Sequence, residues 1–204
     1  MEQGFSDPVF VRNAILTLYC QGPGHHEANA FLIAFEVRDE AWQVLLQLLA
    51  EALQGPQDPT AAGQAEQVAY FAANTLYSKV CKYWKQLPEA SRPELANRLL
   101  DLLGGVSALQ QPPTAVSRAV LKRLGLALAA VSLRSPGGGT ALVSQALQLG
   151  ESFDPSVGHV RPRLALDLLA SLPSEVENAD FSRTRKSELQ SELGAHMGGV
   201  LRLL

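Results

Sequence analysis

The chain has little cysteine and few aromatic residues. Cys20 and Cys81 are its only two cysteines among 204 residues, so the disulfide framework of a small secreted protein is not expected. Each lies within a helical pattern, which favours buried, reduced thiols in a cytosolic or nuclear protein. Aromatic residues make up 6% of the chain, whereas Leu and Ala dominate it, and this balance favours helix over sheet.

Charge and long apolar runs are also scarce. Charged residues make up 18% and hydrophobic residues 47% of the chain, which allows a core and argues against wholesale disorder. The net charge of −3 argues against generic binding to a nucleic-acid backbone. No window of about 18 residues lacks charged or strongly polar groups, so no membrane-spanning helix is expected. The first ten residues do not have the basic and apolar regions of a signal peptide.

The motifs of common catalytic and metal sites are missing. Gly137 to Thr140 lacks the lysine of a phosphate-binding loop, and the chain contains no GxSxG and no CxxC. His25 and His26 lie beside a Gly-Pro-Gly turn without Cys or Asp partners at ligand spacing, which favours a solvated helix start over a metal site. We therefore expect a protein that is not an enzyme and has no cofactor.

What the chain does contain is helical periodicity, most clearly at residues 66–84. This stretch, EQVAYFAANTLYSKVCKYW, has no Gly and no Pro. Its apolar positions recur at helical spacing and form one stripe: Val68, Phe71, Ala72, Thr75, Leu76 and Val80. Other, mostly polar positions fall largely off the stripe: Tyr70, Asn74, Ser78, Lys79 and Lys82. One face of this helix is therefore expected to pack, and the other to meet solvent or a partner.

The whole chain predicts about nine helices with short linkers. They begin near residues 8, 25, 39, 66, 92, 115, 140, 161 and 186, and the expected N-caps include either Ser6 or Asp7, then Ser91 and Thr114. Residues 60–65 are interpreted as a loop, Gly104-Gly105 and Pro173 as helix ends, and 174–185 as irregular. The second helices of successive pairs centre on Phe31, Ala72, Ala127 and Leu168, which lie about 41, 55 and 41 residues apart.

This pairing indicates a repeat protein. A period of roughly 40 to 47 residues with two helices per unit is typical of HEAT-type solenoids. We therefore predict an all-α fold, a right-handed α-α superhelix (a HEAT/ARM-like solenoid) of about four to five helix pairs. The approximate units are residues 7–37, 39–84, 91–133, 140–172 and a partial unit 186–204. An irregular helical bundle would give a similar pattern.

Four stretches, in order, resemble the N-terminal HEAT repeats of the importin-β (karyopherin) family. Residues 7–49 resemble the first repeat and the opening of the second, 69–88 the second helix of the second repeat, and 114–135 that of the third. Residues 164–193, with LeuProSerGluVal at 172–176, are similar to the transportin-SR and importin-thirteen branch. Family members are several times longer than 204 residues and have shorter linkers. We therefore expect this chain to be the front piece of a longer protein.

The resemblance implies a nuclear transport receptor that moves between cytoplasm and nucleus. Its partners would be the GTP form of the small GTPase Ran, protein cargo and nuclear pore proteins, without direct contact to nucleic acid or membrane. The family binds Ran through second helices on the concave side of the N-terminal repeats. By helical phase, the candidate Ran-binding residues are Tyr70, Asn74, Tyr77, Ser78, Arg118, Leu121 and Lys122.

Each of these residues also has a structural interpretation. Tyr70 and Tyr77 can equally well cover a neighbouring helix, and the basic residues are more often a solvated face: Lys79, Lys82, Arg118 and Lys122. Trp42 and Trp84 are expected to be packing anchors between repeats. Two functional alternatives also stay open: a HEAT-repeat scaffold for an intracellular complex without Ran dependence, and, less favoured, an all-helical enzyme.

Overall fold

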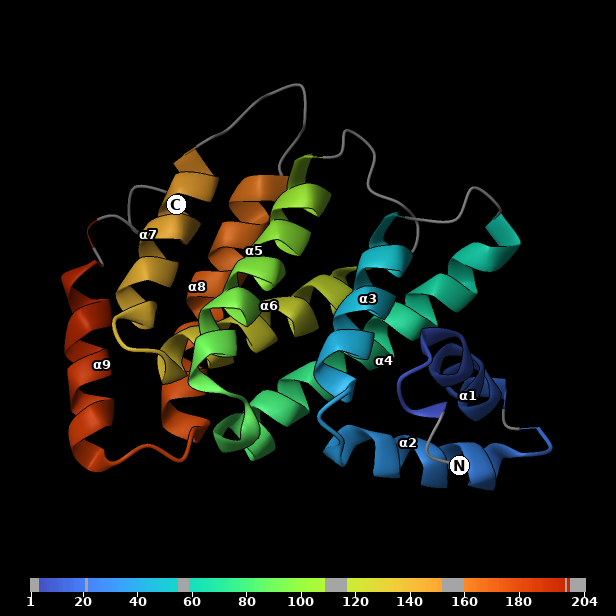
Figure 1. Cartoon of the computed structure of the whole chain (residues 1–204). Coiled ribbons are helices and arrows are strands. Elements are labelled where there is room, and N and C mark those ends of the chain that lie inside the picture. Colours follow the sequence, from blue (N-terminus) through green and yellow to red (C-terminus); the bar gives the residue numbers. More distant parts are fainter. Residues whose placement is uncertain are drawn as a thin grey trace. The chain divides into compact units, whose positions relative to one another are not determined.

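The computed structural model describes residues 4–20, 22–54, 59–108, 117–151, 160–196 and 198. Over these residues all regular elements are helical (Figure 1). The α-helices are α1 (Pro8–Cys20), α2 (His25–Val37), α3 (Ala41–Gln54), α4 (Pro59–Tyr83), α5 (Arg92–Ala108), α6 (Arg118–Arg134), α7 (Gly138–Glu151), α8 (Val160–Asn178) and α9 (Arg183–Ala195), and the 3-10 helices are η2 (Trp84–Gln86) and η3 (Glu89–Ser91). The predicted all-α, HEAT-like fold class is confirmed, and the described ranges hold the nine helices expected.

The chain divides into two compact units. Unit 1 consists of Met1–Pro88 with Pro112–Arg123, and unit 2 of Glu89–Gln111 with Leu124–Leu204. In unit 1, α3 packs along α4 and α1 packs on α2, while α1 and α2 both contact α4. The stripe predicted for α4 is buried except for the half-exposed Phe71. Small residues at the centre of α4, Ala69, Ala72 and Ala73, are completely buried and let the neighbouring helices approach closely.

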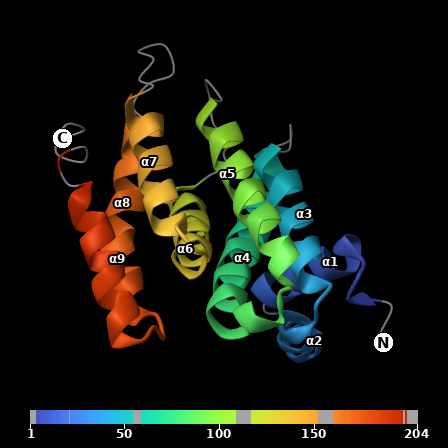
Figure 2. The same ribbon diagram turned by 60° about the vertical axis from the view of Figure 1, so that its left-hand side comes forward.

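Unit 2 is built around the α7–α8 pair, against which α9 packs (Figure 2). The second half of α6 joins the same unit, where Gly125 lies close to the side chain of Leu168 on α8. The start of α9 is capped by Ser182, whose hydroxyl accepts a hydrogen bond of 3.2 Å from the backbone N–H of Arg185. Lys186 ties α9 to the end of α8 by donating to the carbonyl of Glu177 at 2.6 Å.

Helix starts were predicted well where a capping residue is present. The carboxylate of Asp7 accepts a 2.9 Å hydrogen bond from the backbone N–H of Val9, and α1 begins at Pro8 as expected. The bounds of α2 match the prediction, and Gly24 before it has a φ of 87°, a conformation that glycine adopts without strain. The expected cap Thr114 lies outside the described residues; in the structure the N–H of Val120 donates to Ser117 Oγ.

Helix boundaries predicted from glycine and proline were wrong in three places. The segment 60–65 is the start of α4, because its Ala and Gln residues favour helix more than one Gly opposes it. Gly104 and Gly105 lie inside α5, and Pro173 lies inside α8. As a result, residues 174–178 are helical and α9 starts three residues earlier than expected. Packing of the neighbouring apolar residues outweighs the local cost of a glycine or proline in these helices.

Candidate functional site: the outward face of helix α4

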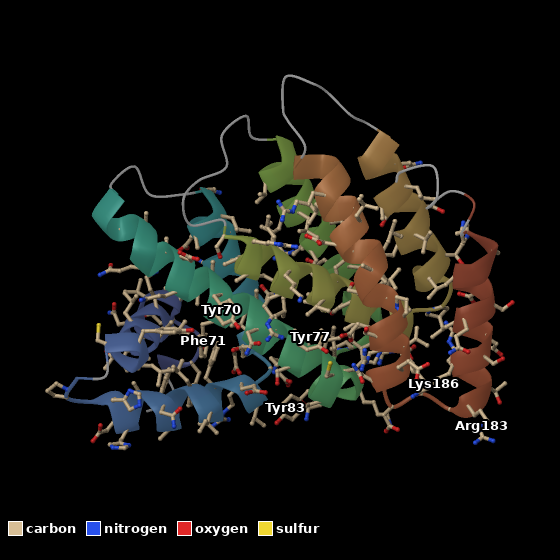
Figure 3. All side chains as sticks on the ribbon, turned by 180° about the vertical axis from the view of Figure 1, so that it is seen from behind. Tyr70, Phe71, Tyr77, Tyr83, Arg183 and Lys186 are labelled. Carbon is tan, nitrogen blue, oxygen red and sulfur yellow. The ribbon has the colours of Figure 1, made fainter. Side chains whose placement is uncertain are left out.

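Helix α4 has one buried and one partly exposed face. Val68, Leu76 and Val80 are among its buried residues. The four candidate residues on α4 are all half-buried: Tyr70, Asn74, Tyr77 and Ser78. Figure 3 shows Tyr70 and Tyr77 two turns apart along the helix. The seven-residue spacing places both rings on the same side of the helix. The predicted phase holds for most of the stripe but fails at Lys79, which is completely buried.

Tyr70 also lies near a neighbouring helix. Burial, and secondly the nearby hydroxyl of Tyr70, raise the pKa of Tyr19 at the end of α1. Tyr70 therefore lies close enough to Tyr19 on α1 to influence its ionisation, while its own side chain is half-buried. This agrees with the structural interpretation of Tyr70 and leaves its contact with a partner as a prediction.

Ser78 and Lys82 share one carboxylate. The hydroxyl of Ser78 donates to Glu36 Oε1 at 2.8 Å, and Lys82 Nζ lies 3.2 Å from the same oxygen. Glu36 belongs to α2, so these contacts connect the outward edges of α2 and α4. Because the side chain of Lys82 is 59% exposed, its ion pair adds at most about 1 kcal/mol to stability. For Lys82, the expected solvated position is confirmed.

Lys79 contradicts the prediction of a solvated position. Its relative exposure is 0%, and its ammonium group donates to the backbone carbonyls of Glu36 at 2.6 Å and Arg38 at 2.9 Å. Burial lowers the pKa of Lys79, an effect that Asp39, Glu36 and Glu40 oppose by favouring the charged form. The sequence offers no signal for this burial, because the two carbonyls belong to a different helix and carry no residue-specific signature.

The two tryptophans, Trp42 and Trp84, differ in how deeply they are buried. Trp42, at the start of α3, is 6% exposed and is the packing anchor that was predicted. Its indole N–H has no hydrogen-bond partner among the described residues. Lys79 Nζ lies 4.7 Å from the centre of its ring, within the range of a cation–π interaction. Trp84 in η2 is only half-buried.

The candidates on α6 lie in its first turns. Arg118 and Lys122 are exposed and Leu121 is half-buried. Residues 118–123 fall in unit 1 together with α4. All seven predicted residues therefore lie in one compact unit, and they combine two aromatic rings with two cations. Tyr and Arg, though not Lys, are enriched at protein–protein interfaces.

The sequence patterns missed exposed apolar side chains on α1 and α2. On α2, Ile33 is 61% exposed and Val37 48%, and on α1 Phe10 is 52% exposed. Phe10 meets Phe31 edge to face, with ring centres 5.0 Å apart. A continuous apolar pattern around α2 was the available signal, because a helix that packs on one side only is expected to be polar on the other.

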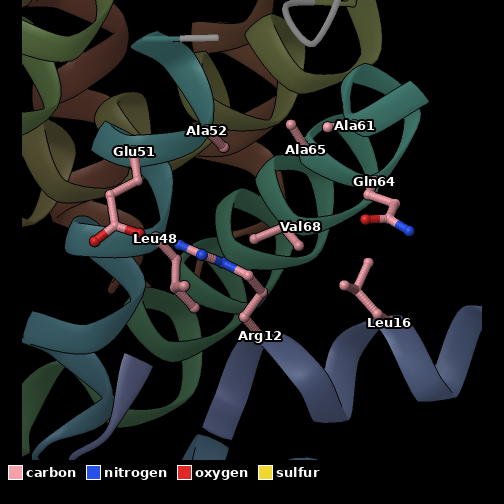
Figure 4. Close-up of a pocket in the computed structure, with 9 residues that line it drawn as sticks. All are labelled: Arg12, Leu16, Leu48, Glu51, Ala52, Ala61, Gln64, Ala65 and Val68. Carbon is pink, nitrogen blue, oxygen red and sulfur yellow. Dashed lines mark hydrogen bonds and ion pairs between the residues drawn. The ribbon is translucent and has the colours of Figure 1, made fainter. Parts of the chain in front are cut away.

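A cavity of about 350 Å³ lies between α1, α3 and the first half of α4 (Figure 4). Its lining is mostly aliphatic, with three alanines and Leu48 among the residues. The ion pair of Arg12 with Glu51 crosses it, and Gln47 donates to the other oxygen of that carboxylate at 2.9 Å. The polar part of the lining thus consists of this ion pair and Gln64.

The described residues contain neither a cluster of metal-binding side chains nor a candidate membrane span. No group of three or more His, Cys, Asp or Glu in those ranges could hold a metal ion; His25 Nδ1 instead lies 2.9 Å from the carbonyl oxygen of Leu18. Among the helices of these ranges, none combines the length and the continuous hydrophobicity that a membrane span requires. Both cysteines are exposed, so the expectation of buried thiols was wrong.

Comparison with known proteins gives one consistent result. No family model matches the chain. Human Importin-13 is 26% identical over 183 residues, which cover 87% of this chain and 17% of that protein, and Importin-13 of Bos taurus gives the same values. An uncharacterized protein of Schizosaccharomyces pombe is 29% identical over 182 residues, 88% of this chain and 16% of its own length. The chain is related to the importin-β family.

The relationship to the importin-β family confirms the resemblance stated from the sequence, including the importin-thirteen branch. It extends along most of the chain, so it includes residues of both compact units. The chain spans only about a sixth of the length of these relatives. The activity and the partners of a full-length importin are therefore treated as a proposal for this chain.

Proposed function

We propose that the chain is part of a nuclear transport receptor and binds the GTP form of Ran through the outward face of α4 and the first turns of α6. The observation that carries this proposal is the similarity to Importin-13 along 87% of the chain, in a fold made of packed helix pairs. The contact residues proposed are those predicted from helical phase: Tyr70, Asn74, Tyr77, Ser78, Arg118, Leu121 and Lys122.

The chemistry of this face suits a protein partner. Tyr70 and Tyr77 provide large amphipathic rings, and Arg118 and Lys122 provide exposed cations. The neighbouring helix α2, which contacts α4, also has two exposed apolar residues that the sequence prediction did not include, Ile33 and Val37. Apolar residues with a polar surround are typical of interfaces that exclude water at their centre.

The proposal includes the other features of a carrier. Protein cargo and nuclear pore proteins would bind elsewhere on the complete receptor, which moves between cytoplasm and nucleus. Ran-GTP and cargo would influence each other's affinity by the same factor, because coupling between two binding sites is reciprocal. This function requires no catalytic group, no cofactor, and no direct contact with nucleic acid or membrane.

A binding assay with Ran in both nucleotide states tests the proposal. The 204-residue chain is immobilised and its affinity is measured for Ran-GTP and Ran-GDP; we expect a clear preference for the GTP form. Equal binding of both forms, or binding of neither, would overturn the proposal. Ran indifference together with a stable complex with another intracellular protein would instead favour the HEAT-repeat scaffold.

Paired variants locate the contact. Asn74→Glu adds a negative charge in the middle of the proposed face and should weaken Ran-GTP binding at least tenfold. Gln43→Glu adds the same charge at an exposed position on α3 and should leave the affinity unchanged. If both variants bind like the wild type, the α4 face is not the Ran-binding surface.

A further inference from the structure

Lys79 caps a helix to which it does not belong. Its ammonium group, on α4, donates to the carbonyl of Glu36 and to that of Arg38, the residue at the C-terminal cap of α2. The last carbonyls of a helix have no partner within the helix and carry partial negative charge. Because α2 has no basic residue in its own last turn, the cation that meets this charge comes from α4.

The same ammonium group also contacts the start of the next helix. Lys79 Nζ lies 4.7 Å from the ring centre of Trp42 on α3 and 5.3 Å from that of Tyr83 at the end of α4. The contacts of Lys79 therefore link α2 of the first helix pair with α3 and α4 of the second. Figure 1 shows the α2–α3 connection beside the later turns of α4.

The polar contacts at the surface depend on this arrangement. Glu36 accepts from Ser78 and Lys82 at the outer edge of the junction, and Ser78 is one of the proposed contact residues. If the C-terminal end of α2 moved away from α4, these contacts would separate, and Ile33 and Val37 would move relative to Tyr77. The shape of the proposed binding face thus follows from how α2 is held.

We propose that Lys79 is a positioning residue: it holds α2 against α4 in the arrangement that binds the partner, without touching the partner itself. This inference rests on the proposed function for its binding part. Lys79 is completely buried, so an effect of its substitution on affinity must act through the placement of α2 and α4.

Hydrogen exchange tests the structural part on the intact chain. In Lys79→Met, which keeps an unbranched apolar stem and removes the ammonium group, amides 38–44 should exchange at least tenfold faster. The middle of α3 and all of α7 should exchange as in the wild type. Lys79→Gln, whose amide can still donate to one carbonyl, should give a smaller change. Unchanged exchange at 38–44 in Lys79→Met would overturn the proposal.

Affinity for Ran-GTP tests the functional part. Lys79→Met should bind at least tenfold more weakly, Lys79→Gln less so, at a temperature where circular dichroism shows both variants folded. Lys85→Met, the same change at an exposed lysine, should bind like the wild type. Leu49→Ala, which destabilises the buried side of α3, should also keep its affinity; if it weakens binding as much as Lys79→Met, general destabilisation explains the loss and the proposal is overturned.

The two proposals can fail separately. If the wild type binds Ran-GTP and Lys79→Met binds equally well, the positioning role is overturned and the proposed function stands. If the wild type binds neither form of Ran, the proposed function and its coupling to Lys79 both fail. Faster exchange confined to 38–44 would still support the role of Lys79 in holding α2 on α4.

Discussion

The ammonium nitrogen of Lys79 lies over the indole ring of Trp42, 4.7 Å from its centre. The lysine comes from the second half of α4 and the tryptophan from the first turn of α3, and both are buried. A buried cation on an aromatic face contributes about 2 kcal/mol where water is excluded. This pair is therefore a part of the unit 1 core in which charge and aromatic packing act together.

Shortening Trp42 in steps should separate these contributions. Trp42→Phe keeps an aromatic face and removes an indole N–H that lacks a hydrogen-bond partner in the described residues, so we expect it to cost only about 1–2 kcal/mol. Trp42→Ala leaves a cavity and should cost about 3–5 kcal/mol. Urea unfolding measures both values. Equal costs for the two variants would show that the ring face beside Lys79 contributes nothing.

The stability of the protein should depend on Lys79 at alkaline pH. Burial lowers the pKa of Lys79 from its ordinary value of 10.5, with Asp39, Glu36 and Glu40 acting in the opposite direction. Between the folded and unfolded pKa values the unfolded state binds more protons, so the contribution of Lys79 to the free energy of unfolding rises with pH. The contribution is lowest below the folded-state pKa, where the buried charge is fully present.

A comparison with Lys79→Met isolates this effect. The unfolding free energy of the wild type minus that of the variant should increase as the pH rises toward 10.5, because other titrating groups are common to both proteins. Urea unfolding at a series of pH values gives the difference. A difference that stays constant or decreases over this range would contradict the expected lowering of the Lys79 pKa.

Tyr19 should ionise at a higher pH than an ordinary tyrosine, and burial should contribute more to this increase than Tyr70 does. Its pKa is raised above the ordinary value of 10.0 first by burial and secondly by Tyr70. We expect Tyr70→Phe to remove only the smaller part of this increase. Because folded Tyr19 keeps its proton to higher pH, its contribution to stability is lost as the pH rises from 10.0 through the folded value.

Ultraviolet absorbance of the phenolate follows this titration. The chain has four tyrosines, and subtraction of a Tyr19→Phe titration assigns the signal of Tyr19. If Tyr70→Phe returns the Tyr19 pKa to 10.0, the tyrosine pair and not burial governs its ionisation.

Two helical glycines should respond oppositely to the same substitution. Gly105 on α5 has open space around the position of a Cβ atom, so Gly105→Ala should stabilise the chain by about 0.5–1 kcal/mol through helix propensity. A Cβ atom at Gly125 on α6 would lie 3.0 Å from Leu168 Cδ2. We therefore expect Gly125→Ala to give no gain, or a loss of about 1 kcal/mol, because Leu168 is buried and must shift. Thermal unfolding measures the stability of each variant relative to the wild type. Equal stabilisation by both substitutions would contradict the expected clash and would mean that α6 and α8 can move apart at little cost.

Local signals explain which parts of the fold were predictable. The start of α1 at Pro8 and both ends of α2 follow from capping and turn residues, whose effect is confined to a few neighbours. Gly104 and Pro173 misled the prediction for the opposite reason. A glycine or proline costs about 1 to 3 kcal/mol in a helix, and burial of several leucines on the same helix outweighs this amount. Single-residue signals cannot show that balance.

The sequence by itself determined the helical class and most of the buried stripe of α4, which includes Val68, Ala72 and Leu76, because each depends on spacing along one helix. Tertiary structure alone decided that Lys79 is buried while Lys82, three residues later, is exposed. The physical reason is that the partners of Lys79 are backbone carbonyls more than forty residues away. Every residue type provides such carbonyls, so only the folded arrangement of α2 against α4 selects the lysine that reaches them.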